Sequence, residues 1–229
     1  MLLVEATEKH YKDKWLKNII LFLSSQTISL FGSSLVQYAI LWHITLKTES
    51  GLMMTLYIIC GFIPTFILSP VAGVWADRYN RKLLIILADG LIAFATLILA
   101  ILFFIGFNAI WLLFVIAAIR AFGTGVQMPA IGAILPQIVP KDKLTKVNGI
   151  NGSIQAIILF LSPMVSTVLL SFTSIEMIFF IDVITAAIAI STILFFLKVK
   201  THKKAKEIQT TSYFADFKLG LHYVTQHRF

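Results

Sequence analysis

Three charged side chains lie deep inside long apolar stretches of this sequence: Asp89, Arg120 and Asp182. A charge at the centre of a membrane helix costs about 2.5–3.5 kcal/mol on insertion scales, so such residues pair with one another or serve a function. An Arg–Asp pair lowers the cost of burying both charges. It can also act as a proton switch, because protonation of the acid releases the arginine. The alternative is a static pair that holds two helices together.

The depth of each charge can be derived from the helical rise of ~1.5 Å per residue. Asp89 lies about 10 Å from one end of its apolar stretch, and Asp182 about 10 Å from the opposite side of the membrane. Arg120 is roughly 16 Å from that opposite side, which is near the middle of the hydrocarbon. Arg120 therefore lies at a depth close to that of either acid, and all three residues are candidates for proton coupling. The sequence leaves open which acid Arg120 faces.

Several uncharged polar side chains also fall at membrane depth. A glutamine is costly where it faces lipid, so we expect these residues to line a central substrate cavity or to form hydrogen bonds between helices. Two of them, Gln26 and Gln37, are eleven residues apart and lie on nearly the same face of a helix. The candidates for the cavity are Gln26, Gln37, Gln127 and Gln155.

The elements that position these residues are six predicted membrane helices, each near the roughly 20 residues needed to cross the hydrocarbon. They cover residues 18–44, 52–76, 83–104, 109–138, 144–172 and 175–197. Residues 1–17 precede the helices, and residues 198–229 form a basic linker followed by an amphipathic segment with Phe214, Phe217, Leu221 and Val224 at helical spacing. The predicted fold class is an all-α membrane protein.

Composition agrees with this class. The 229 residues are 58% hydrophobic and 13% charged, whereas a soluble domain is about half apolar and a quarter charged. The net charge of +8 comes from bases in short segments between the apolar stretches, which excludes nucleic-acid binding as the reason for it. These segments alternate along the chain, so both termini are expected in the cytoplasm. The single cysteine, Cys60, lies in an apolar stretch, and no enzyme, metal or cofactor motif is expected.

The segment between the second and third predicted helices is unusually rich in charge. It carries Gly73, Asp77, Arg78, Arg81 and Lys82 within ten residues. This spacing resembles the Gly-x-x-x-Asp-Arg/Lys-x-Gly-Arg/Lys-Arg/Lys loop of the major facilitator superfamily of transporters. Asn80 stands where that family has glycine, and asparagine tolerates the left-handed backbone that glycine would supply. A basic cytoplasmic turn without further function is the alternative.

Other stretches support the resemblance. Arg120-Ala-Phe-Gly123-Thr-Gly125 is similar to the fourth-helix pattern of the family, although its glutamine is missing and its glycines come one position earlier. With Gly61-Phe-Ile-Pro64 and Ile181-Asp182-Val it resembles the macrolide-efflux branch. The resemblance implies six helices built as a 3+3 inverted repeat, which is half of the facilitator fold. It also implies that Arg120 serves proton coupling and that the Gly73–Lys82 loop is a conformational latch between two halves.

The resemblance implies a multi-pass protein of a bacterial plasma membrane that exports an amphipathic compound, such as a macrolide, against protons. Its partners would then be the lipid bilayer, the substrate, protons and a C-terminal six-helix half outside this sequence. Related branches export siderophores or move lysolipids, and the sequence does not separate them. From a different class, the chain is a non-transporting fragment or an accessory half-transporter.

Overall fold

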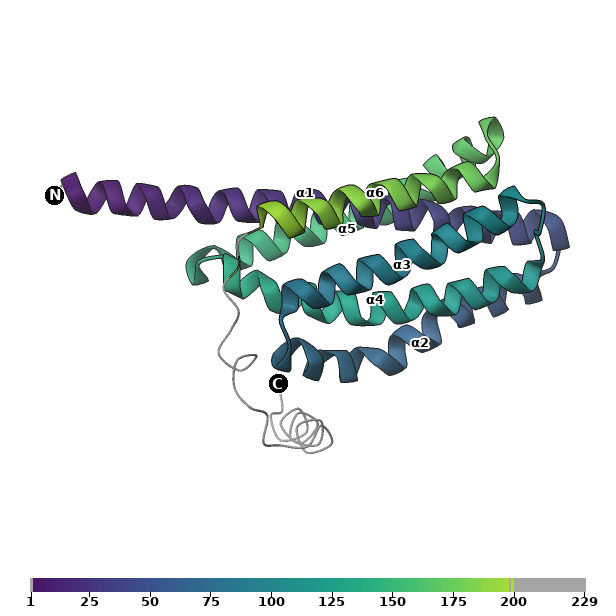
Figure 1. The fold of residues 1–229 in the computed structure, drawn as a ribbon, viewed down its shortest axis with the longest axis horizontal. Coiled ribbons are helices and arrows are strands. Elements are labelled where there is room, and N and C mark those ends of the chain that lie inside the picture. Colours follow the sequence, from purple (N-terminus) through teal and green to yellow (C-terminus); the bar gives the residue numbers. More distant parts are fainter. Residues whose placement is uncertain (1, 198, 200–229) are drawn as a thin grey trace.

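A computed structural model describes residues 2–197 and 199, with side chains from Trp15 onward. Six long α-helices and one short 3₁₀ helix make up this part of the chain (Figure 1). They are α1 (Leu2–Thr48), α2 (Gly51–Arg78), α3 (Arg81–Phe104), α4 (Ile110–Ile138), η1 (Lys141–Lys143), α5 (Leu144–Phe172) and α6 (Ile175–Phe196).

All six α-helices are long and apolar enough to cross a membrane, so the predicted fold class is confirmed. Most helix ends lie within two residues of the prediction, because the polar residues that interrupt the apolar stretches also end the helices. The exception is α1, which begins at Leu2 rather than near residue 18 and ends at Thr48 rather than residue 44. The predicted amphipathic segment at residues 214–224 lies outside the described residues.

The helices differ in how much of their surface is buried inside the bundle. In the most apolar windows of α1, α3, α4 and α6, 33–50% of the residues are buried, against 6% in α2 and 17% in α5. In the described part of the chain, α4 packs between α2 and α3, and α6 packs against α1 and α3. Polar side chains that must be shielded from lipid can therefore be placed between α1, α3, α4 and α6.

Two hydrophobic clusters fill the two ends of the bundle. One contains Ile40, Leu99, Leu113 and Phe179, and the other contains Phe22, Ile85, Ile134 and Ile193. Along each of α1, α3, α4 and α6, the buried charged side chains and their hydrogen-bonding partners fall between these clusters. They form a central polar layer of Gln26, Ser29, Ser33, Asp89, Thr96, Arg120, Gln127 and Asp182.

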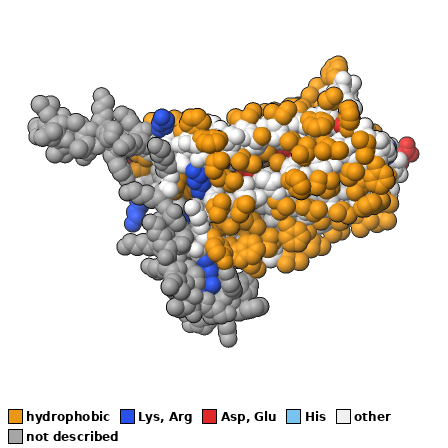
Figure 2. Space-filling view, viewed as in Figure 1, with side chains coloured by type: hydrophobic (Ala, Val, Ile, Leu, Met, Phe, Trp, Pro, Cys, Tyr) orange, Lys and Arg blue, Asp and Glu red, His pale blue; other side chains and the backbone are white. Residues whose placement is uncertain are grey.

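The outer surface has the distribution expected in a bilayer. Hydrophobic side chains cover the length of the bundle in the view of Figure 2, and lysines and arginines gather at one end. The α2–α3 and α4–α5 connections lie at that end, because successive helices run in opposite directions. This separation of an apolar belt from a basic end is typical of a helical membrane protein.

Candidate functional site

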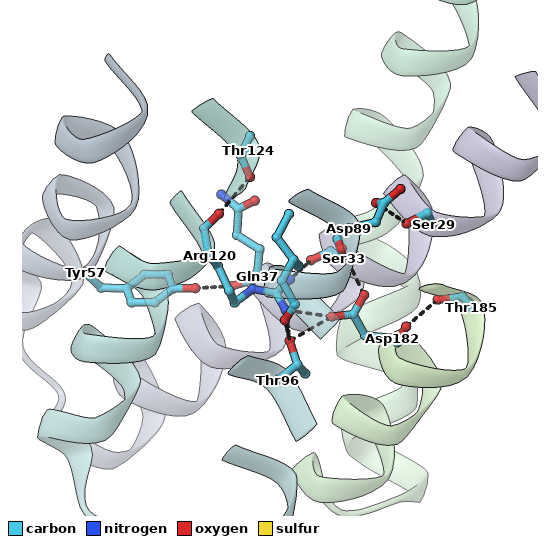
Figure 3. A network of polar contacts seen from close by, with 11 residues as sticks. Ser29, Ser33, Gln37, Tyr57, Asp89, Thr96, Arg120, Thr124, Asp182 and Thr185 are labelled. Carbon is cyan, nitrogen blue, oxygen red and sulfur yellow. Dashed lines mark hydrogen bonds and ion pairs between the residues drawn. The ribbon is translucent and has the colours of Figure 1, made fainter. Parts of the chain in front are cut away.

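The central polar layer is built around an ion pair between α4 and α6. Arg120 Nη1 lies 2.6 Å from Asp182 Oδ2, and the Asp182 side chain is fully buried (Figure 3). The structure thus decides the question that the sequence left open: Arg120 pairs with Asp182 and not with Asp89. A bond this short between buried charges is charge-assisted, and it compensates part of the cost of removing both groups from water.

Two further helices hold this pair in place. Thr96 of α3 accepts a hydrogen bond from Arg120 Nη1 and donates to Asp182 Oδ2 at 3.0 Å. Ser33 of α1 donates from its hydroxyl to Asp182 Oδ1 at 2.9 Å, while its carbonyl oxygen accepts from Arg120 Nη2 at 3.0 Å. The pair therefore joins α1, α3, α4 and α6 in one network.

Glycines allow these helices to approach. A Cβ atom on Gly32 would overlap Thr185 Oγ1 and lie 3.2 Å from the Cα of Asp182, so only glycine fits between α1 and α6 at this level. A Cβ on Gly123 would lie 2.5 Å from Ile92 Cγ1 and 3.2 Å from the carbonyl oxygen of Ala88. Close approach of the backbones brings the short side chains of Ser33 and Thr96 within reach of the ion pair.

Asp89 forms a separate cluster with neutral groups. Its Oδ1 accepts from Ser29 Oγ at 2.9 Å and from Gln127 Nε2 at 2.6 Å, and its Oδ2 accepts from Gln26 Nε2 at 3.3 Å. All four residues are buried, with relative exposures of 2–3%. In the described part of the chain no basic side chain forms a salt bridge with Asp89. A buried carboxylate stabilised by neutral donors alone can exist as the anion or as the neutral acid.

A cavity of about 330 Å³ lies beside the polar layer, between α1, α2 and α4. Its lining includes Arg120, so the ion pair borders the cavity directly. The polar side chains of the lining otherwise come from serine, threonine, tyrosine and glutamine, and these are Ser33, Ser34, Gln37, Tyr38, Tyr57, Thr65, Thr124 and Gln127. A small set of polar groups in an apolar wall is typical of a small-molecule site.

The four glutamines that the sequence singles out occupy different places. Gln37 and Gln127 line the cavity. Gln26 is buried behind it, where its amide faces Asp89 rather than the cavity. Gln155 lies half-buried on α5 and is not among the residues that line this cavity.

The charged loop between α2 and α3 fastens helices to one another. Arg81 donates from Nε to the carbonyl oxygen of Ala76 at 2.8 Å and from Nη1 to that of Ala133 on α4 at 2.7 Å. It also meets Asp77, at 3.4 Å between Nη2 and Oδ1. Lys82 donates from Nζ to the carbonyl oxygens of Leu194 and Leu197, at the C-terminal end of α6. A cation there satisfies carbonyls that the helix leaves unpaired.

The remaining loop residues are placed as follows. Arg78 is buried, with a relative exposure of 5%, and Gly73 is half-buried with room for a Cβ atom. Asn80 does not adopt the left-handed backbone that asparagine would tolerate at this position. Its φ of −66° and ψ of 110° are extended, and its Oδ1 accepts from the backbone N–H of Lys82. Asn80 is the N-cap of α3, so asparagine is used here for its side-chain oxygen.

Four residues that hold or make room for the buried carboxylates were not predicted from the sequence: Ser29, Ser33, Thr96 and Gly32. A signal for two of them was available, because Gln26, Ser29 and Ser33 recur at intervals of three and four and so share one helix face. Thr96 similarly follows Asp89 by seven residues, which is about two turns. Polar residues at this spacing in an apolar helix indicate a face turned away from lipid.

Six membrane-length helices around a buried ion pair and a polar-lined cavity define a membrane protein of the transporter class. Residues 19–226 match the family model of the Major Facilitator Superfamily. The chain belongs to this superfamily, which is a family of transporters and not of enzymes. Its six helices are a half of the facilitator fold.

Proteins similar to this chain include macrolide efflux proteins and a staphyloferrin A transporter. Macrolide efflux protein A of Streptococcus pyogenes is 34% identical over 181 residues, which is 79% of this chain and 45% of that protein. Macrolide efflux protein A of Enterococcus faecalis is 38% identical over 134 residues, or 58% of this chain and 42% of that protein. The staphyloferrin A transporter of Staphylococcus aureus is 26% identical over 152 residues, or 66% of this chain and 38% of that protein. The chain thus spans about half the length of the curated relatives it matches.

Proposed function

We propose that this chain acts in the proton-coupled efflux of an amphipathic compound, such as a macrolide antibiotic, together with a C-terminal six-helix half. The observation that carries the proposal is the Arg120–Asp182 ion pair, which is buried between the two hydrophobic clusters and whose Arg120 lines the cavity between α1, α2 and α4. The similarity to two macrolide efflux proteins supports the substrate class.

The coupling would use the response of this network to a proton. Protonation of Asp182 removes the charge that holds Arg120, and the guanidinium then competes for other acceptors at the cavity wall. Asp89 offers a second buried carboxyl group in the same layer. A compound that binds the cavity in one protonation state more tightly than in the other is thereby coupled to the proton.

The α2–α3 loop would serve as a latch in this cycle. Arg81 and Lys82 tie α2, α3, α4 and α6 together at the basic end. Gly73, Asp77 and Arg78 belong to the same loop, and we expect the loop to bind the other half in one state and release it in the other. We place this end, with both termini, on the cytoplasmic side of a bacterial plasma membrane, because basic loops face the cytoplasm.

The test is drug accumulation in a bacterial strain that lacks its own exporters. The chain is expressed alone and together with a C-terminal six-helix half, and uptake of radiolabelled erythromycin is followed with and without a protonophore. The proposal predicts lower accumulation that the protonophore restores, loss of this effect in Arg120→Ala and Asp182→Asn, and retention in the surface variant Asp142→Asn. Unchanged accumulation by a well-expressed protein would refute it and favour a non-transporting accessory role.

The similarity to the staphyloferrin A transporter supports a siderophore as a second substrate class. Export of an iron chelator into the medium by the same cells, without any change in erythromycin accumulation, would favour this alternative.

A further inference from the structure

The polar layer contains one side chain that belongs to both the buried carboxylate and the cavity. Gln127 donates from Nε2 to Asp89 Oδ1 at 2.6 Å, and it also lines the cavity between α1, α2 and α4. Asp89 itself is not part of the cavity lining and is only 2% exposed. A molecule in the cavity therefore reaches Asp89 through the Gln127 amide.

Asp89 differs from Asp182 in what stabilises its charge. Asp182 has Arg120 at 2.6 Å, so its charge is compensated by a full positive charge. Asp89 has three neutral donors, from Gln26, Ser29 and Gln127. Burial disfavours the anion and the donors favour it, so a change in the strength of one donor shifts the balance between the two forms.

The charged groups near Asp89 are bound to partners of their own, so its three neutral donors are the groups that stabilise its anion directly. On α1, residues 19–36 contain no titratable side chain, and on α4 and α6 the nearby charges are Arg120 and Asp182, which bind each other. On its own helix, Arg81 and Lys82 lie about two turns away and donate to backbone carbonyls of α2, α4 and α6. In the part of the chain described here, the donors are what a ligand can perturb.

The neutral acid also has an acceptor within reach. Gln26 is 98% buried, since its relative exposure is 2%, and its Oε1 has no hydrogen-bond partner among the described residues. Rotation of the Gln26 amide by half a turn exchanges Nε2 for Oε1 opposite Asp89 Oδ2. A protonated Oδ2 would then donate to Gln26 Oε1, so the cluster can satisfy Asp89 in either protonation state.

We propose that Gln127 couples the cavity to the proton on Asp89 and selects for substrates that carry a hydrogen-bond donor. This inference rests on the proposed function, which makes the cavity the substrate site. Gln127 uses Nε2 on Asp89, which leaves Oε1 as its acceptor toward the cavity. A substrate N–H or O–H that donates to Oε1 polarises the amide and strengthens its N–H donation to Asp89.

The effect makes binding of the substrate and binding of the proton oppose each other, as an exchange of substrate for proton requires. A stronger donor stabilises the Asp89 carboxylate, so binding of the substrate releases the proton from the Asp89 carboxyl O–H to water. Rebinding of a proton weakens the Gln127 bond to Asp89 and removes the advantage of the donor-bearing substrate. A substrate that has only acceptors would instead take an N–H of Gln127 away from Asp89 and favour the neutral acid.

The test compares two lipophilic cations that differ in donors: ethidium, which carries aromatic amino groups, and tetraphenylphosphonium, which has no N–H or O–H. The full chain is reconstituted in lipid nanodiscs. The infrared band of protonated carboxyl groups is titrated, and the Asp89 component is identified by its loss in Asp89→Asn. Near the midpoint of that titration, each cation is added and the loss of the band and the release of protons are measured.

We expect ethidium to shift the protonation equilibrium of Asp89 toward the anion by about 1.3- to 5-fold, because polarisation strengthens one charge-assisted hydrogen bond by about 10–30%. Tetraphenylphosphonium, which supplies the same charge, should have a much smaller effect. Gln127→Met should abolish the difference between the two cations, whereas Gln155→Met, the same substitution at a half-buried glutamine of α5 outside the cavity lining, should retain it. Gln127→Asn, whose shorter amide cannot bridge both sites, provides a second variant if Gln127→Met does not fold.

An ethidium-specific proton release that persists in Gln127→Met or in Gln127→Asn would overturn the proposal. So would equal effects of the two cations on the wild-type chain. Ethidium fluorescence separates these results from a failure of the proposed function: a chain that binds ethidium without moving the Asp89 band refutes the role of Gln127, and a chain that binds neither cation refutes the cavity as the substrate site.

Discussion

Removal of the charge on Asp182 is the perturbation with the largest expected effect on the stability of this fold. In Asp182→Asn the side chain keeps its size and can still accept one hydrogen bond, but Arg120 loses its counter-ion. Arg120 has a side-chain exposure of 10%, and Asp182 of 0%, so neither charge can be solvated in place. Breaking a buried ion pair by removing one partner costs about 3–5 kcal/mol.

That cost corresponds to a decrease of about 150- to 5,000-fold in the ratio of folded to unfolded protein. The full chain is purified in mild detergent, and unfolding is followed by circular dichroism as sodium dodecyl sulfate is titrated in. The matched control is Asp142→Asn at the pair between Lys143 and Asp142, which is 3.1 Å long with side chains that are 50% and 69% exposed. An exposed pair contributes about 0–1 kcal/mol, so this variant should unfold like the wild-type chain.

Replacement of both Arg120 and Asp182 is the complementary experiment. In Arg120→Met with Asp182→Leu no charge is left unpaired, so we expect the double variant to be more stable than Asp182→Asn and to lose transport altogether. Asp182→Asn and Asp142→Asn with the same stability would refute the reasoning, because the Arg120–Asp182 pair would then contribute no more than a surface contact. A double variant less stable than Asp182→Asn would do the same.

Three further predictions concern packing and helix ends. Gly32→Ala should destabilise the chain by about 1–3 kcal/mol, because the added Cβ overlaps Thr185 Oγ1 and separates α1 from α6. The same unfolding titration measures this loss of stability. Its control is Gly90→Ala, where a Cβ meets nothing within 4 Å, and this variant should be as stable as the wild-type chain or more stable. Asn80→Ala should cost about 1 kcal/mol and Asn80→Gly a few tenths, because the position is an N-cap; a clear gain in stability for Asn80→Gly would restore the left-handed interpretation. Lys82→Met should remove the donor to the carbonyls of Leu194 and Leu197 and so increase hydrogen exchange at the C-terminal end of α6. If the exchange there equals that of the wild-type chain, Lys82 does not stabilise this helix end.

Several residues around Asp182 lie outside the motifs that resemble the macrolide-efflux branch. Ser33, Thr96 and Gly32 belong to no pattern by which the resemblance was identified, yet they hold Asp182 in place or make room for it. Short polar or small residues were overlooked because each one, taken alone, is common in membrane helices. Their role depends on the helix that they face.

The sequence by itself determined the six helices, the basic end of the bundle and the depth at which each charge is buried. The physical reason is local: the hydrocarbon sets the length of an apolar helix, and an apolar stretch of that length crosses the membrane whichever helix lies opposite. The role of Asn80 as an N-cap did not follow from the same local information, because a family pattern with glycine does not say whether the position needs a left-handed φ or a cap.

Only the tertiary structure decided which groups meet. Asp89 and Asp182 lie at depths that are both within reach of Arg120, and the choice between them follows from the packing of α4 against α3 and α6. The same packing gives two glutamines different surroundings. Gln26 faces Asp89, whereas Gln127 faces both Asp89 and the cavity. Contacts between helices depend on rotation and close approach, and these are set by all the side chains at an interface rather than by the residues that carry the charge.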